Sequence, residues 1–174
     1  AKTPHFLQMH AGDLDRVQLD TFANTQSIPL EGYQTLEFLN IDGAAMEANG
    51  ETLAASVQDN GLTTQSDSFD CLLDLGGNVI QPNQGEVYIP IVYWKEGFAQ
   101  IGDTLTVCGR PFTVAGYLRD SQMNASLATS KRFLVSEADY EALRPQGSVE
   151  YLIEFRLADS DTLGAFEAAY LAAA

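Results

Sequence analysis

The chain has 174 residues, of which 45% are hydrophobic and 10% aromatic, enough apolar material for the core of one domain or two small lobes. The chain has nine Lys and Arg residues and 24 Asp and Glu residues, so the formal net charge at pH 7 is -15. A surface this acidic repels phosphate backbones and anionic lipid headgroups, which excludes nucleic acid as an expected partner. No window approaches the run of about 20 apolar residues that a membrane span requires.

Residues 4–41 predict a strand, a helix and a second strand. The first strand covers residues 4–10, and a helix opens after Gly12 with Asp13 as its expected N-cap. The apolar positions of this helix follow a helical spacing, at Leu14, Val17 and Phe22. The second strand is expected over Tyr33–Ile41. Residues 42–68 carry turn signals but no periodicity, so no element is assigned there.

Two further strand patterns follow in the middle of the chain. The alternation from Phe69 to Leu75, a glycine turn and Val79-Ile80 predict a hairpin. Glu86–Trp94 predicts a strand, and because Pro90 lacks a backbone N–H, an edge position in the sheet is expected for it.

Ile101–Val135 is the stretch with the clearest strand and turn signals. Alternating residues on both sides of a turn at Cys108–Pro111 predict a hairpin that ends near Leu118. A polar segment without periodicity follows from Arg119, and residues 133–135 predict a third strand.

The last part of the chain predicts helix, strand and helix. Ser136 is the expected N-cap of a short helix, with Asp139 at the capping-box position. Val149–Leu157 has an apolar residue at every second position, so one apolar face should be buried and one polar face wet, the latter carrying Glu150, Glu154 and Arg156. A final helix from Ser160 or Asp161 should bury Leu163, Phe166 and Tyr170.

This order of elements predicts an α+β fold with a split lobe. Residues 1–48 and 146–174 would form one α+β lobe from both chain ends, and residues 49–145 would form an inserted β-rich lobe. The linkers near residues 42–68 and around Pro145–Gly147 are the expected pivots.

The residue patterns predict neither catalysis, nor a cofactor, nor a metal site. His5 and His10 would face opposite sides of one strand, and Asp67, Asp70 and Asp74 lack the spacing of a calcium loop. Cys71 and Cys108 are expected as free thiols, with a disulfide as the alternative. A Gly-x-Ser-x-Gly elbow, a P-loop and a GxGxxG motif are all missing from the sequence.

The polar segment after the hairpin is the candidate contact surface. It places basic and amphipathic residues on an otherwise acidic chain, at Arg119, Asp120, Gln122, Met123, Asn124, Lys131 and Arg132. Two interpretations stay open: a solvated loop, or a surface that contacts another domain or subunit.

Several segments resemble the extracytoplasmic domain of FtsX-like, MacB-like ABC transporter permeases. They are residues 5–12 (HFLQMHAG), 85–90 (GEVYIP), 101–107 (IGDTLTV), 112–120 (FTVAGYLRD) and 130–136 (SKRFLVS). The resemblance covers most of the chain in order and is weakest across residues 43–68.

The resemblance implies a membrane protein with its large loop on the extracytoplasmic face, between two transmembrane helices. The implied domain is a porter-like α+β lobe that carries a β-rich lobe. Its partners would be its own transmembrane helices, a separate cytoplasmic ATPase subunit, and a peptide, lipid or lipoprotein substrate. The domain would relay helix movement without catalysis, and membrane-spanning segments are expected before Ala1 and after Ala174. The rival hypotheses are a secreted hydrolase using acidic residues and a freestanding extracellular binding module.

Overall fold

A computed structural model describes residues 3–119 and 130–173 of the chain. Its strands are β1 (Phe6–Ala11), β2 (Leu30–Ile41), β3 (Met46–Ala48), β4 (Glu51–Thr52), β5 (Asp59–Thr63), β6 (Glu86–Pro90), β7 (Thr104–Val107), β8 (Arg110–Leu118), β9 (Ser130–Leu134) and β10 (Ser148–Leu157). Its α-helices are α1 (Arg16–Thr25), α2 (Ile91–Lys95), α3 (Glu137–Leu143) and α4 (Leu163–Ala173). Short 3-10 turns are η1 (Gly43–Ala45), η2 (Arg144–Gln146) and η3 (Ser160–Thr162).

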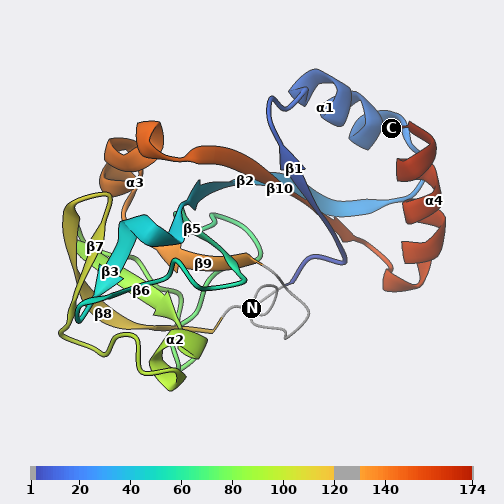
Figure 1. Cartoon of the computed structure of the whole chain (residues 1–174). Helices are drawn as coiled ribbons and strands as arrows, with labels where there is room; N and C mark the ends of the chain where they lie inside the picture. The colour runs from blue at the N-terminus through green and yellow to red at the C-terminus, as the bar shows by residue number, and fades with distance from the viewer. Residues whose placement is uncertain (1–2, 120–129, 174) are drawn as a thin grey trace.

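The fold is α+β, as the sequence predicts. The strands form one ten-stranded sheet in the order β1-β10-β2-β5-β9-β6-β8-β7-β3-β4. Figure 1 shows a small lobe with α1 and α4 and a larger lobe with most of the short strands. Among the described helices, none has the length and apolar character needed to cross a membrane.

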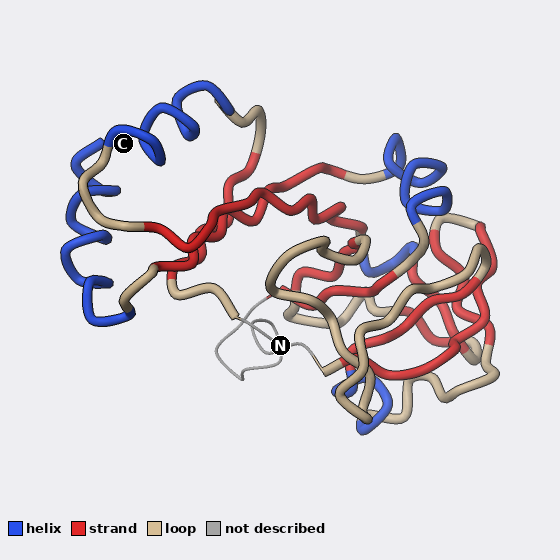
Figure 2. Tube along the Cα trace, turned by 180° about the vertical axis from the view of Figure 1, so that it is seen from behind, coloured by secondary structure: helices blue, strands red, loops and turns tan. Residues whose placement is uncertain are grey.

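The small lobe is built by the two ends of the chain. β10 pairs antiparallel with both β1 and β2, so β1 and β2 run parallel with β10 between them. The strand-helix-strand order predicted for residues 4–41 is confirmed, and the strand from the far end of the chain inserts into it. Figure 2 shows this three-stranded ribbon running from the two helices into the larger lobe.

Aromatic rings hold α1 and α4 against one face of the ribbon. Phe166 of α4 is fully buried, 4.8 Å from the ring of Phe155 on β10 and 5.8 Å from that of Phe22 on α1. Phe6 and Tyr170 complete the cluster, with ring centroids 4.8 Å apart. The burial of these rings removes a large apolar area from water and fixes both helices on the same face.

The larger lobe has its own apolar core, centred on β5, β6, β8 and β9. Parallel pairs join β5 to β9 and β6 to β8, and β7 and β8 form the predicted antiparallel hairpin. Its turn uses Cys108 and Gly109, whose φ angles are 51° and 81°. Positive φ at both central residues is the conformation that matches the twist of a tight hairpin.

The expected strand Glu86–Trp94 is half correct. β6 ends at Pro90, and Ile91–Lys95 form the helix α2, in which Tyr93 is buried. Pro90 is the N-cap of this helix, where a missing N–H has no cost. The expected edge position is wrong, because β6 lies between β9 and β8.

The hairpin expected from residue 69 to residue 80 is present only as a short antiparallel turn. Leu73 bridges Val79, and the nitrogens of Asp74 and Ile80 donate to the backbone oxygens of Asn78 and Leu72. The Asp74 carboxylate holds the expected turn, but the pairing does not extend into the predicted strands. Asp70 has φ 55°, which interrupts an extended strand, and the side chain of Gln65 binds the backbone of Leu72 instead.

The helix caps agree with the sequence at α3 and differ at α1. Ser136 caps α3 by accepting a hydrogen bond from the nitrogen of Asp139, as predicted. Asp15, not Asp13, caps α1, because its carboxylate accepts from the nitrogen of Gln18. The helix therefore begins at Arg16, two residues later than the sequence predicts.

The predicted division of the chain at residues 48 and 146 stays a prediction. β3 pairs with β7, so the chain has already entered the larger lobe at Met46. At the other boundary, Ser148 begins β10 opposite Asn40 of β2.

Candidate functional site

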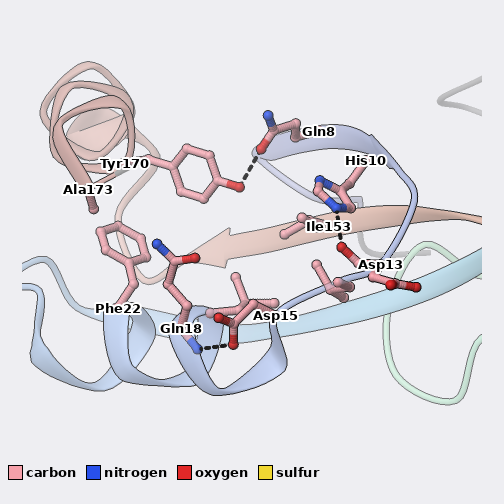
Figure 3. A pocket seen from close by; sticks show the side chains of 11 residues that line it. Gln8, His10, Asp13, Asp15, Gln18, Phe22, Ile153, Tyr170 and Ala173 are labelled. Carbon is pink, nitrogen blue, oxygen red and sulfur yellow. Dashed lines mark hydrogen bonds between the residues drawn. The ribbon is translucent and has the colours of Figure 1, made fainter.

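A cleft of about 370 Å³ opens between β1, α1 and α4 in the small lobe. Figure 3 shows its lining, which consists of Gln8, His10, Asp13, Leu14, Asp15, Gln18, Leu19, Phe22, Ile153, Tyr170 and Ala173. A volume of this size is typical of small-ligand sites.

The floor of the cleft is apolar and its rim is polar. Leu19 and Ile153 are buried. Phe22 lies beside them, because it follows Leu19 by three residues and so shares the same face of α1. The rim carries the carboxylates of Asp13 and Asp15, the second of which is engaged as the cap of α1. The cleft can therefore receive an apolar group with a hydrogen-bonding or cationic end.

Two hydrogen bonds close the rim. The hydroxyl of Tyr170 donates to Oε1 of Gln8 and so links α4 to β1. Nε2 of His10 donates to the backbone oxygen of Asp13 at 2.8 Å. Burial raises the pKa of the Tyr170 phenol, which keeps its proton in place as a donor. Among the lining side chains no nucleophile is paired with a base.

A second polar feature lies on the opposite face of the ribbon, between the lobes. Nη1 and Nη2 of Arg132 donate to both carboxylate oxygens of Asp70, at 2.9 and 3.1 Å. Both side chains are 1% exposed. A fork of two parallel bonds in a buried position is a strong and geometrically specific ion pair.

Glu154 lies beside this pair, and its position corrects a sequence expectation. It was expected on a wet face of β10, yet it is fully buried. Its Oε1 accepts from Nε2 of Gln34 at 2.9 Å, whereas its Oε2 has no hydrogen-bond partner in the described part of the chain. Burial, together with the hydrogen bond and the charge of Asp70, raises the pKa of Glu154 to about 9.

The predicted contact surface is only partly described. Arg119 is exposed at the end of β8, where its backbone pairs with that of Leu73. Lys131 and Arg132 are 4% and 1% exposed in β9, so an exposed position for them is wrong. β9 is an interior strand between β5 and β6, and the side chain of Arg132 is buried in its ion pair with Asp70. The remaining predicted residues, Asp120, Gln122, Met123 and Asn124, lie outside the described residues.

The other candidate residues lie apart. Nδ1 of His5 accepts from the nitrogen of Leu157, which makes it part of the sheet edge. Cys71 and Cys108 carry free thiols. Within residues 3–119 and 130–173, no three His, Cys, Asp or Glu side chains converge as metal ligands would.

Four of the five segments that resemble the permease family meet in the larger lobe, whereas residues 5–12 form β1 of the small lobe. Residues 85–90 and 112–118 form the paired strands β6 and β8. Asp103 lies in the turn before β7, where its carboxylate accepts from Asn49 and from the nitrogen of Gln100, both at 2.9 Å. These hydrogen bonds lower the pKa of Asp103 and hold the turn.

By sequence, the chain matches neither a protein-family model nor a curated protein. Among solved structures, a candidate lipoprotein from Bacillus anthracis matches with a TM-score of 0.53 and 10% identity, over 92% of this chain and 87% of that chain. The periplasmic region of MacB from Actinobacillus actinomycetemcomitans matches with a TM-score of 0.48 and 14% identity, over 95% of this chain and 81% of that chain. The first match shows a shared fold and nothing further.

Proposed function

We propose that this chain is the non-catalytic extracytoplasmic domain of an FtsX-like ABC transporter permease. In this role it relays the movement of transmembrane helices, driven by a separate cytoplasmic ATPase subunit, to a substrate or partner outside the membrane. The observation that carries the proposal is the ordered set of family-like segments, because residues 85–90 and 112–118 fold into neighbouring strands of one lobe.

The ribbon supports a mechanical role. β2 and β10 have 12 and 10 residues, and their pairing extends from Ser148 opposite Asn40 to Leu157 opposite Leu30. Bending such a ladder would strain many hydrogen bonds at once, so the ribbon is expected to move as a stiff unit. The first and last elements, β1 and α4, both belong to the small lobe, so flanking segments would attach there.

The pivots would lie where the ribbon enters the larger lobe. β2 ends at Ile41, and β10 begins just after Gly147. A Cβ on Gly147 would lie 2.5 Å from the backbone oxygen of Asn40, so the two strands meet there in close backbone contact. Hinges are commonly a few residues at the ends of elements, which fits these positions.

The cleft of the small lobe is where a transported or sensed molecule would bind. Its apolar floor, with Leu19 and Ile153, suits part of a peptide, a lipid or a lipoprotein. The hydrolase alternative gains no support from the described residues, since Glu154, the carboxyl group with a pKa near 9, is fully buried away from substrate.

Thiol labelling of the full-length protein in intact cells tests the placement. Val57 is 91% exposed, so V57C in a C71A/C108A background gives one accessible thiol on the larger lobe. A membrane-impermeant maleimide should label it in intact cells. The C71A/C108A protein without V57C is the control. Labelling that appears only after the cytoplasmic membrane is broken would contradict the proposal.

A further inference from the structure

We propose that a proton on Glu154 locks the two lobes together through a joint made of Gln34, Asp70, Arg132 and Glu154. The joint would tighten as the surrounding pH falls and loosen as it rises. This inference deepens the proposed relay by naming a condition that controls it. Its test uses the purified chain alone, so it stands or falls separately from the permease assignment.

The joint connects elements of both lobes. Glu154 comes from β10 of the ribbon, next to Ile153 and Phe155, whose side chains pack under α1 and α4. Because side chains alternate along a strand, Glu154 points to the opposite face. Arg132 comes from β9, inside the sheet of the larger lobe, where it lies opposite Gly61 of β5.

The loop that carries Asp70 is held between these strands. Nε2 of Gln34 donates to the backbone oxygen of Phe69 at 2.7 Å and to Oε1 of Glu154 at 2.9 Å. Oε1 of Gln34 accepts from the hydroxyls of Ser66 and Ser68 at 3.2 and 2.8 Å. One side chain of β2 therefore clamps the loop and the carboxyl group together. Asp70 itself has φ 55°, a conformation that persists only when its surroundings enforce it.

The charge balance of the joint requires the proton. Arg132 contributes one positive charge, which the bidentate pair with Asp70 already neutralises. A charged Glu154 would leave a second buried carboxylate without a counter-ion, which is strongly unfavourable. A protonated Glu154 is neutral. With the proton on Oε2, this otherwise unpartnered atom can donate a hydrogen bond to Asp70.

Among residues 3–119 and 130–173, the cross-strand neighbours of Glu154 carry no charge. Its cross-strand partners on β1 and β2 are Leu7 and Gln34, both uncharged. From the larger lobe, Asp70 raises and Arg132 lowers the pKa of Glu154. Lys131 precedes Arg132 in β9, so its side chain leaves the strand on the other face.

The direction of the pH effect follows from the raised pKa. An unperturbed glutamate has a pKa near 4.5, whereas Glu154 in the folded chain has a pKa of about 9. Between these values the folded chain holds a proton that the unfolded chain has released. The stability that this proton contributes is therefore fully present below about pH 4.5 and is lost as pH rises toward 9. The unfolding equilibrium constant should rise by a factor of about ten per pH unit in this range.

Urea unfolding of the purified chain at pH 5, 6, 7 and 8 tests the lock. E154Q keeps a neutral group that can accept from Gln34 and donate toward Asp70. In the wild type, Glu154 should raise the unfolding equilibrium constant about tenfold per pH unit, and this contribution should be missing from E154Q. E150Q is the matched control, since Glu150 lies on the same strand and is only half-buried, and it should keep the wild-type slope. Equal slopes for wild type and E154Q would overturn the proposal.

Two measurements on the wild-type chain keep the proposal testable if E154Q does not fold. A carboxyl-carbon NMR titration should place the midpoint of Glu154 above pH 7, and a midpoint below pH 6 would overturn it. Hydrogen exchange, corrected for its intrinsic pH dependence, should show less protection of residues 64–72 at pH 8.5 than at pH 6. Unchanged protection would overturn the link between the proton and the lobes.

Discussion

Asp139 in α3 accepts a hydrogen bond from the backbone nitrogen of Gly85 at 2.8 Å, although 54 residues separate them. The same carboxylate binds Arg110 at 2.9 Å and is 1% exposed. Asp139 is thus more than the capping-box residue that the sequence predicts. It fastens α3 to the loop before β6 and to the first residue of β8.

We expect Asp139→Asn to destabilise the chain by about 2–3 kcal/mol, because it leaves buried donors without their charged acceptor. Burial would raise the pKa of Asp139, but hydrogen bonds from Gly85, Arg110 and Ser136 outweigh it and lower the pKa. A depressed pKa gives stability above the ordinary value near 4 that is lost as pH falls through the folded value. Urea unfolding at pH 3–7 should show a shallower acid limb for the variant. Glu137→Gln, at an exposed position of α3, is the control.

Gly61→Ala should destabilise the chain by about 1–3 kcal/mol through overpacking. A Cβ on Gly61 would lie 2.4 Å from Cζ of Phe38 and 2.7 Å from the backbone oxygen of Leu39. Gly164→Ala is the contrasting control, because a Cβ there meets nothing within 4 Å in the first turn of α4. It should stabilise the helix by up to about 1 kcal/mol. Thermal unfolding of both variants checks the pair, and equal effects would contradict the packing.

Phe166→Ala should cost about 3–5 kcal/mol, since the ring is fully buried between α4 and the ribbon. Leu171→Ala on the same helix should change the stability by less than about 0.5 kcal/mol, because Leu171 is 74% exposed. Urea unfolding followed by circular dichroism measures both. A small effect at Phe166 would show that α4 does not pack as described.

Both cysteines should titrate as free thiols. Burial raises the pKa of Cys71, with a further contribution from the charge of Asp70, and burial followed by the charge of Asp42 raises that of Cys108. Both thiols should react more slowly with an alkylating reagent at pH 7 in the folded chain than in urea. A thiol titration under denaturing, non-reducing conditions should count 2 thiols per chain. A count below that would favour the disulfide.

Local signals explain which elements the sequence predicted. The hairpin of β7 and β8 was predictable because its turn residues, Cys108 and Gly109, follow directly on alternating strands. β10 was predictable from its period of two. α2 was not predictable, because the apolar residues after Pro90 fit a strand equally well. In the structure, Pro90 is the N-cap from which the helix begins.

The polar joint and the cleft were beyond sequence reasoning. The pattern of β10 identifies Glu154 as polar, but its burial depends on Asp70 and Arg132, whose positions come from other parts of the fold. The cleft joins Gln8 to Tyr170, which are 162 residues apart. The one available signal was Leu152, an apolar residue between Glu150 and Glu154 on the face of the strand that was expected to be wet.

The relay itself is tested most directly by energy transfer in proteoliposomes that hold the full-length protein and its ATPase subunit. A donor at V57C in the C71A/C108A background reports the distance between the larger lobe and acceptor lipids in the bilayer. We predict a transfer efficiency that shifts when ATP binds and returns after hydrolysis. A Gly-Ser-Gly insertion after Ile41 should abolish the shift, and the same insertion between the exposed Gly76 and Gly77 should preserve it. An efficiency that stays constant through the ATP cycle would show that the larger lobe does not move with the transmembrane helices.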